Sequence, residues 1–218
     1  MLIADARPAA TVILMREAAT GFETFLMRRS TTMRFAPGMY VFPGGRVDDD
    51  DFTDDDELSG YMNCAVREVQ EETGVVLGKR PGDLVFADHW VTPEFVPERY
   101  SARFFLAKMP VEQTATSMST ETDLVIWISP ADALVETAAG RLPLLLPTLM
   151  VLQWLAEHDN EQDLVAAARS REIKPKLPRP SKSVDGTEVW AIVDADTGEI
   201  LIENQPAPKL SELTGLHR

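Results

Sequence analysis

Short runs of apolar and β-branched residues recur through the first 130 positions of the chain, separated by glycine, proline or charged residues. Runs of this kind are typical of β-strands bounded by turns. The first two runs are separated by Thr20 and Gly21, which suit a tight turn. The pattern predicts six strands, over residues 11–15, 23–27, 39–42, 84–91, 103–107 and 124–128.

A helical spacing replaces the strand pattern over residues 58–73. Tyr61, Cys64 and Val69 stand at i, i+3 and i+8, so they share the apolar side of one helix. Gly74 follows where a helix commonly ends on a glycine in the left-handed conformation. We therefore expect one long amphipathic helix between the third and fourth strands.

The second half of the chain reads differently. Helices are expected over 130–139 and 143–157, each opened by a proline, and over 162–170. Residues 171–183 carry five basic side chains and three prolines, which predicts an extended connector. A hairpin is expected from 188–193 and 199–202, which flank Asp-Thr-Gly. The expected class is α/β (α+β) with a mixed sheet, and the expected division is a domain over 1–170 followed by a connector and hairpin over 171–218.

The net charge of the chain argues against some kinds of binding partner. The 218 residues include 35 acidic and 21 basic side chains, and the formal net charge is −14. This excess argues against binding to nucleic acid or to an anionic membrane by bulk electrostatics. Eight of the acidic residues fall within 48–57, which predicts a solvated loop. A calcium loop is the alternative, but it needs a glycine at its sharp turn and this run contains none.

Cysteine content and hydropathy indicate the cellular compartment in which we expect the protein. Cys64 is the single cysteine, which excludes an internal disulfide or a cysteine-cluster zinc site and suits a reducing compartment. No apolar run reaches the roughly 18 residues of a membrane span, so we expect no membrane partner. The first residues lack a secretory pattern and the last three are no targeting tripeptide. We expect a cytoplasmic protein.

Three glutamates provide the candidate chemistry. Glu68, Glu71 and Glu72 stand at i, i+3 and i+4 of the predicted helix and therefore share one face. Crowded carboxylates repel one another, and a hard divalent cation such as Mg²⁺ or Mn²⁺ compensates that repulsion. Arg67 lies one turn before Glu71 and can hold a carboxylate in a bidentate fork. The alternative is a charged, solvent-exposed helix face without catalytic use.

Residues 67–75 (REVQEETGV) resemble the second half of the Nudix box, the signature of the Nudix hydrolases. The first half departs from that pattern. The separation between Gly45 and Arg67 is longer than in the family, and the acidic run fills the extra length. Ser59 stands where the family has a glutamate, and Glu57 lies two residues too early for that position.

A second motif lies upstream. Residues 25–45 (FLMRRSTTMRFAPGMYVFPGG) are similar to the additional motif of the coenzyme A diphosphatases, except that Met27 stands where threonine is usual. With the expanded box, this likeness is greatest to the peroxisomal-type subgroup. It implies that the substrate phosphates are bound by Arg29, Arg34, Gly44 and Gly45. The physical alternatives are an arginine cluster paired with the acidic loop and a plain tight turn.

The resemblance implies a Nudix α/β/α sandwich with helix 58–73 on one face of the sheet, helix 143–157 on the other, and a C-terminal hairpin extension. It also implies metal-dependent hydrolysis of a diphosphate, here coenzyme A or an acyl derivative, to 3′,5′-ADP and (acyl-)4′-phosphopantetheine. The implied metal ligands are Glu68, Glu71 and Glu72, with Mg²⁺ or Mn²⁺ as cofactor. Arg67 would orient them, and Glu68 or Glu121 would be the base, with Glu94 and Glu112 as rivals to Glu121.

Two further hypotheses stay open. Another Nudix substrate, such as ADP-ribose, NADH or a diadenosine polyphosphate, fits the same box. A Nudix-fold nucleotide-binding regulator without catalysis is favoured by Ser59 and opposed by the intact glutamate set. The C-terminal extension could also mediate a homodimer.

Overall fold

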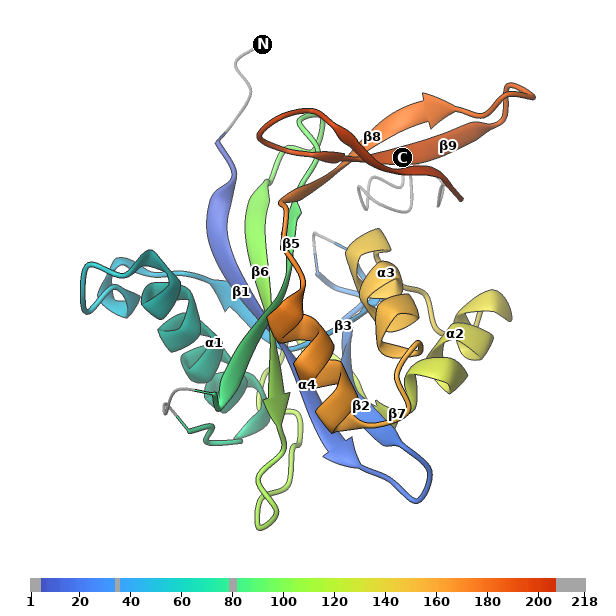
Figure 1. The fold of residues 1–218 in the computed structure, drawn as a ribbon. Helices are drawn as coiled ribbons and strands as arrows, with labels where there is room; N and C mark the ends of the chain where they lie inside the picture. The colour runs from blue at the N-terminus through green and yellow to red at the C-terminus, as the bar shows by residue number, and fades with distance from the viewer. Residues whose placement is uncertain (1–4, 34–35, 79–81, 207–218) are drawn as a thin grey trace.

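The computed structural model describes residues 5–33, 36–78 and 82–206. Within these ranges one sheet is built from β1 (Arg7–Glu17), β2 (Phe22–Arg29), β3 (Tyr40–Val41), β4 (Gly44–Arg46), β5 (Leu84–Val91), β6 (Tyr100–Lys108), β7 (Thr122–Ile128), β8 (Lys176–Lys182), β9 (Glu188–Asp194) and β10 (Ile200–Pro206) (Figure 1). Four helices accompany it: α1 (Glu57–Thr73), α2 (Pro130–Ala138), α3 (Leu146–Leu155) and α4 (Glu161–Ser170).

The strand order is β10-β9-β8-β5-β6-β1-β2-β3, with β4 paired to β1 and β7 paired to β2. β1 runs parallel to β6 and antiparallel to β2, so the sheet is mixed, as the sequence predicts. Each of the six predicted segments coincides with a strand; four of these strands are longer than their apolar runs, whereas β3 covers only the middle two residues of 39–42. Backbone pairing extends a strand into polar residues that the hydrophobic pattern does not mark.

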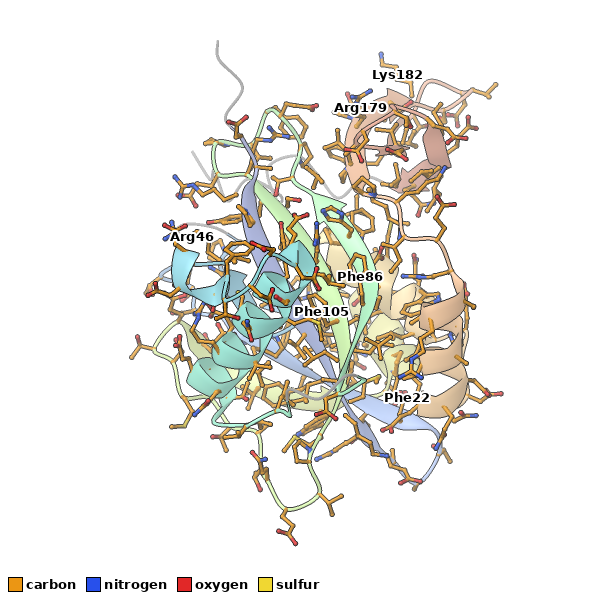
Figure 2. All side chains as sticks on the ribbon, turned by 60° about the vertical axis from the view of Figure 1, so that its left-hand side comes forward. Phe22, Arg46, Phe86, Phe105, Arg179 and Lys182 are labelled. Atoms are coloured by element: carbon orange, nitrogen blue, oxygen red, sulfur yellow. The ribbon has the colours of Figure 1, made fainter. Side chains whose placement is uncertain are left out.

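The two faces of β1 point to two different cores. Val12 and Leu14 pack with α1 on one face, while Ile13 and Met15 pack with the other three helices. This alternation is the two-residue period of a strand that is buried on both sides. Figure 1 shows α1 on one side of the sheet and α2, α3 and α4 on the other. In Figure 2, Phe105 lies beneath α1, where its ring contacts Phe86 at a centroid distance of 5.7 Å. The predicted α/β/α layering is confirmed.

The helix expected over 143–157 begins later than the sequence predicts. α3 starts at Leu146, and Pro147 rather than Pro143 occupies its first turn. The carbonyl of Pro143 accepts a hydrogen bond of 2.9 Å from Tyr40 N–H, and Leu144 forms a β-bridge to Tyr40. These contacts hold the preceding residues extended against β3, so the helix cannot include them.

The expected connector over 171–183 is largely a strand. β8 pairs with β9 along its length and meets β5 at Trp90 and Lys176. Lys176 Nζ lies 2.7 and 2.8 Å from the carboxylate oxygens of the buried Asp88. This ion pair joins the segment to the sheet, which the proline-rich composition does not foretell. β9 and β10 form the predicted hairpin, whereas the domain boundary after residue 170 stays a prediction.

None of the helices in the described ranges has both the length and the apolar character needed to cross a bilayer.

Candidate active site

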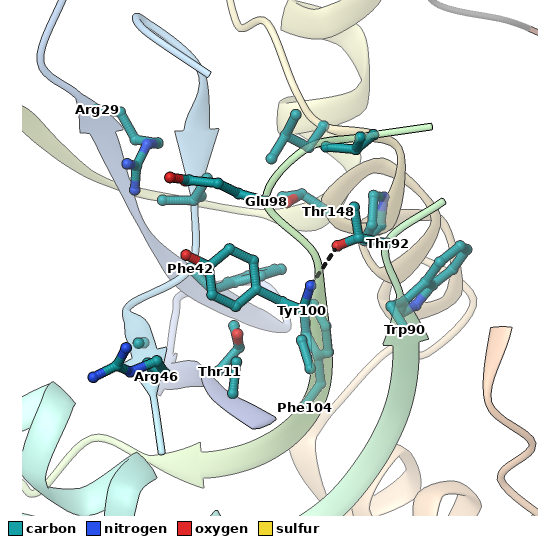
Figure 3. Close-up of a pocket in the computed structure, with 18 of the residues that line it drawn as sticks. Thr11, Arg29, Phe42, Arg46, Trp90, Thr92, Glu98, Tyr100, Phe104 and Thr148 are labelled. Atoms are coloured by element: carbon teal, nitrogen blue, oxygen red, sulfur yellow. Dashed lines mark hydrogen bonds between the residues drawn. The ribbon is translucent and has the colours of Figure 1, made fainter. Parts of the chain in front are cut away.

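One cavity of about 670 Å³ brings together residues that are far apart in the sequence. Its walls come from β1, β4, the inner face of α1, the loop between β5 and β6, the start of α3, and β8. Figure 3 shows Arg29 and Arg46 on one side of this cavity and Trp90 on the other. Six of the residues predicted for the site line it: Arg29, Gly44, Gly45, Glu68, Glu72 and Glu121.

Two of the other predicted site residues lie outside the cavity. Arg67 and Glu71 do not line the cavity; the Glu71 side chain is 61% exposed, and Arg67 Nη1 lies 3.5 Å from its carboxylate. Arg34 falls outside the residues that the structure describes. Ser59, which replaces the family's first glutamate, lies in the first turn of α1, where its hydroxyl donates to the carboxylate of Asp54. The roles predicted for Glu71 and Arg34 stay predictions.

Glycine at position 44 lets β4 approach β1 and α1 closely. A Cβ at Gly44 would lie 2.3 Å from the carbonyl oxygen of Ala10, and its φ of +154° lies at the edge of the range that disfavours side chains. The Gly44 N–H donates a 2.9 Å hydrogen bond to Glu72 Oε2. The Gly44 N–H thus contacts a glutamate in this structure. The predicted approach of this backbone to a phosphate stays a prediction.

Of the two α1 glutamates on the cavity wall, Glu72 has the more strongly shifted pKa. Burial raises the pKa of Glu72 to about 7, and the Gly44 N–H opposes that rise. The charge of Glu68 raises this pKa further, Arg29 lowers it and Glu121 raises it. Three carboxylates and one arginine therefore share an electrostatic environment with an excess of negative charge.

Glu68 is packed against the other glycine of the turn. A Cβ at Gly45 would lie 2.4 Å from the Glu68 carboxylate carbon, so only glycine leaves room for this carboxylate. Burial raises the pKa of Glu68, while its 2.7 Å ion pair with Arg67 opposes that shift. The Phe-Pro-Gly-Gly turn thus positions both cavity-lining glutamates of α1.

For the diphosphate hydrolysis that the Nudix resemblance implies, we expect Gly45→Ala to lower kcat/KM by about tenfold. The added methyl would displace the Glu68 carboxylate from its place on the cavity wall. The group that must move is the end of a flexible side chain, so the melting temperature should stay close to that of the unmodified protein. Gly44→Ala is the contrasting variant, because its methyl would meet the backbone of β1. Unchanged kinetics in Gly45→Ala would show that the position of Glu68 is unimportant.

Arg67 connects the acidic run to the carboxylates of α1. Its Nε and Nη2 donate to the two carboxylate oxygens of Asp51 at 3.1 and 2.8 Å, and its Nη1 donates to Glu68. The hydrogen bonds to Asp51, and then those to Glu68, raise the pKa of the Arg67 guanidinium. Arg67 therefore contacts both Asp51 and Glu68, and its role in orienting the glutamates stays a prediction.

The prediction of a solvated loop over 48–57 is wrong for Asp51, which is 7% exposed, although most of the run is exposed. Asp51 ends a single 3₁₀ turn, Asp49–Asp51, and its carboxylate accepts the backbone N–H of Asp48 at 2.9 Å. Phe52 follows and packs against Gly60 of α1, where any Cβ would overlap its ring. Sequence reasoning missed Asp51 because a segment with eight acidic residues among ten gives no sign of which one turns inward.

Arg28 and Arg29, the two described members of the arginine cluster in the upstream motif, lie in different environments. Arg29 lines the cavity, whereas Arg28 pairs with Asp123 at 2.7 Å outside it. Arg46 also lines the cavity, and its side chain lies 3.5 Å from Asp48. Sequence reasoning missed Arg46; its position directly after the two glycines is the signal that could have found it. Of the candidates for the further acidic residue, Glu121 lines the cavity and its rivals Glu94 and Glu112 do not.

The donor set suits a hard divalent cation. Glu68, Glu72 and Glu121 offer carboxylate oxygens beside one cavity, which is the ligand type that Mg²⁺ and Mn²⁺ prefer. Across the residues with described positions, however, no three acidic, histidine or cysteine side chains already converge as a metal-binding group. Arg67 and the Gly44 N–H currently satisfy Glu68 and Glu72, so a cation would compete with those contacts.

Comparison with known proteins identifies the family to which this chain belongs. The family model of the NUDIX domain matches residues 5–149, and the chain therefore belongs to the Nudix family. It is a Nudix hydrolase, an enzyme that hydrolyses a nucleoside diphosphate linked to another moiety. Enzymes of this family generally use divalent metal ions.

Individual relatives agree with this assignment. A Caenorhabditis elegans protein named as nudix hydrolase 7 is 27% identical over 211 residues, which cover 82% of this chain and 69% of the relative. The crystal structure of a NUDIX hydrolase from Alicyclobacillus acidocaldarius matches with a TM-score of 0.69 and 26% identity, over 76% of this chain and 97% of that chain. The NUDIX domain of Shewanella oneidensis NrtR, solved with ADP ribose, shares the fold with a TM-score of 0.51 and 17% identity, over 71% and 88% of the two chains.

Proposed function

We propose that this hydrolase cleaves the diphosphate of coenzyme A or an acyl-coenzyme A, giving 3′,5′-ADP and (acyl-)4′-phosphopantetheine. The observation that carries the proposal is the composition of the cavity, which joins a carboxylate cluster to an extended apolar end. Coenzyme A has a matching polarity, because its phosphates lie toward the nucleotide and an uncharged chain of methylene and amide groups extends from the diphosphate.

The charged end of the cavity fits the diphosphate. Arg29 and Arg46 reach it from β2 and β4, and guanidinium groups bind phosphate in a bidentate manner. Glu68 and Glu72 would hold the divalent cation together with Glu71. When bound, such a cation neutralises charge on the phosphates and lowers the pKa of the attacking water.

The chain's own residues would complete the reaction around the scissile diphosphate. Glu68 and Glu121 both line the cavity, so either carboxylate can accept the proton of the attacking water. Arg67 restrains Glu68 through a 2.7 Å ion pair and is itself fixed by Asp51. Water then forms a new bond to one phosphorus while the bond from that phosphorus to the bridging oxygen breaks.

The apolar end fits the pantetheine chain. Trp90, Phe104 and Leu146 supply apolar surface there. Thr148, in the first turn of α3, is 4% exposed and lines the cavity. Its hydroxyl can donate or accept a hydrogen bond, so it would bind an amide group of the pantetheine chain.

The test is a comparison of substrates with the purified protein in Mg²⁺ or Mn²⁺. We expect kcat/KM to be at least about tenfold higher for coenzyme A than for ADP-ribose, NADH or a diadenosine polyphosphate. Mass spectrometry should identify 3′,5′-ADP and 4′-phosphopantetheine, and EDTA should suppress both products. A higher kcat/KM for another compound would overturn the substrate assignment. Binding without turnover of any compound would instead support the regulatory hypothesis.

Two broader expectations accompany this proposal. The charge and cysteine content support a cytoplasmic enzyme without nucleic-acid or membrane partners. A homodimer through the C-terminal hairpin is likewise a prediction, which sedimentation measurements can check.

A further inference from the structure

Strand β8, which lies beyond the residues matched by the family model, contributes to the cavity wall. Pro178 of β8 is buried and lines the cavity. Phe95, in the loop between β5 and β6, also lines the cavity, and its ring stacks on that of Trp190 in β9 with centroids 5.9 Å apart. The hairpin of β8 and β9 therefore supplies one residue of the cavity wall and supports a second one, Phe95. Figure 1 shows the position of this hairpin in the fold.

Several contacts fix the hairpin against the strands that carry this wall. Lys176 Nζ pairs with Asp88 at 2.7 Å and lies 5.3 Å from the ring centroid of Trp90, a cavity residue. A second ion pair, Arg179 to Glu94 at 4.0 Å, links β8 to the loop that carries Phe95. The hairpin is thus attached both to β5 and to the loop that follows β5.

The Trp190 side chain, which supports Phe95, is buried in the core. Trp190 is 1% exposed and belongs to the same buried cluster as Trp90 and Phe104, which both line the cavity. Closely packed aromatic side chains hold their positions, so the wall is shaped before a ligand binds. Its lining atoms at Pro178 and Phe95 are apolar, which suits contact with a hydrocarbon chain and not with a phosphate.

We propose that the hairpin of β8 and β9 is a specificity element, the surface against which an acyl chain on the coenzyme A substrate packs. This inference rests on the proposed function. It assigns Pro178 to direct contact with the chain and Trp190 to a positioning role through Phe95. The hairpin would then discriminate among substrates that share the same diphosphate and differ only in the length of the apolar chain.

The test measures kcat and KM for coenzyme A and for its acetyl, hexanoyl and decanoyl derivatives. For Pro178→Ala and Trp190→Ala, we expect KM for decanoyl-coenzyme A to rise about tenfold, with a progressively smaller effect as the chain shortens. Values of kcat should stay within about twofold, because the contact is made equally in the ground state and the transition state. Trp190→Phe should restore the original values, since it keeps a ring beneath Phe95.

Val184→Ala is the matched control, because Val184 belongs to the turn of the same hairpin and its side chain is fully exposed. It should leave every KM unchanged. Pro178→Ala keeps the test valid if Trp190→Ala fails to fold. Equal changes for coenzyme A and its decanoyl derivative, or no change for either, would overturn the inference alone. An unmodified enzyme that cleaves ADP-ribose but no coenzyme A compound would overturn the proposed function and the inference with it.

Discussion

Replacing Glu72 with glutamine should lower kcat/KM by about a thousandfold and leave the fold intact. Glu72 lines the cavity, and burial raises the pKa of its carboxyl to about 7. Glutamine has the same shape and keeps an oxygen that can accept the Gly44 N–H, so the backbone contact survives. The negative charge that would attract a divalent cation is lost, and with it most of the stabilisation of the transition state.

The measurement compares steady-state kinetics, circular dichroism and manganese binding for the variant and the unmodified enzyme. Glu112→Gln is the control, since Glu112 is exposed and lies outside the cavity, and its activity should not change. Glu71→Gln is informative beside it, because a loss similar to that of Glu72→Gln would place the exposed Glu71 among the metal ligands. Full activity in Glu72→Gln would refute the assignment of this cluster to metal-dependent hydrolysis.

Replacing Asp51 with alanine should destabilise the protein by about 2–3 kcal/mol. Asp51 is buried and accepts two hydrogen bonds from the Arg67 guanidinium. Its removal leaves that guanidinium with one partner fewer in a partly desolvated place, and it also frees the backbone N–H of Asp48. Turnover should fall as well, because Arg67 then restrains Glu68 less well.

Thermal unfolding checks this prediction, with an expected decrease in the melting temperature of about 5–10 °C. Asp55→Ala is the matched control within the same acidic run, because Asp55 is exposed and is expected to change stability by less than about 0.5 kcal/mol. Equal effects of the two substitutions would mean that the run acts only through its total charge. The contrast therefore separates one structural aspartate from its solvated neighbours.

Local chemistry was readable from the sequence wherever the residues involved are close along the chain. The spacing of Glu68, Glu71 and Glu72 places them on one helical face whatever surrounds the helix. The same holds for the apolar side of α1, for the six strands and for the glycine that ends α1, whose φ is +76°. The Nudix resemblance likewise rests on short contiguous motifs, and it predicted the layered fold correctly.

Contacts between distant segments were not readable in this way. The composition of 171–183 indicates an extended chain, but only the pairing of Lys176 with Asp88 and of β8 with β9 makes it part of the sheet. The acidic run gave no sign of its inward residue, since the Arg67 guanidinium that donates to the Asp51 carboxylate lies 16 positions later in the chain.

By itself, the sequence determined which side chains this protein offers for catalysis, because helix and strand periodicities fix the direction of each side chain from local geometry. The tertiary structure decided which of them share a cavity. It brought Arg29, Gly45 and Glu121 to the glutamates of α1 and left Arg28 outside. It also placed Pro178 in the wall of that cavity, because burial of an apolar surface is satisfied by whichever segment of the folded chain arrives there.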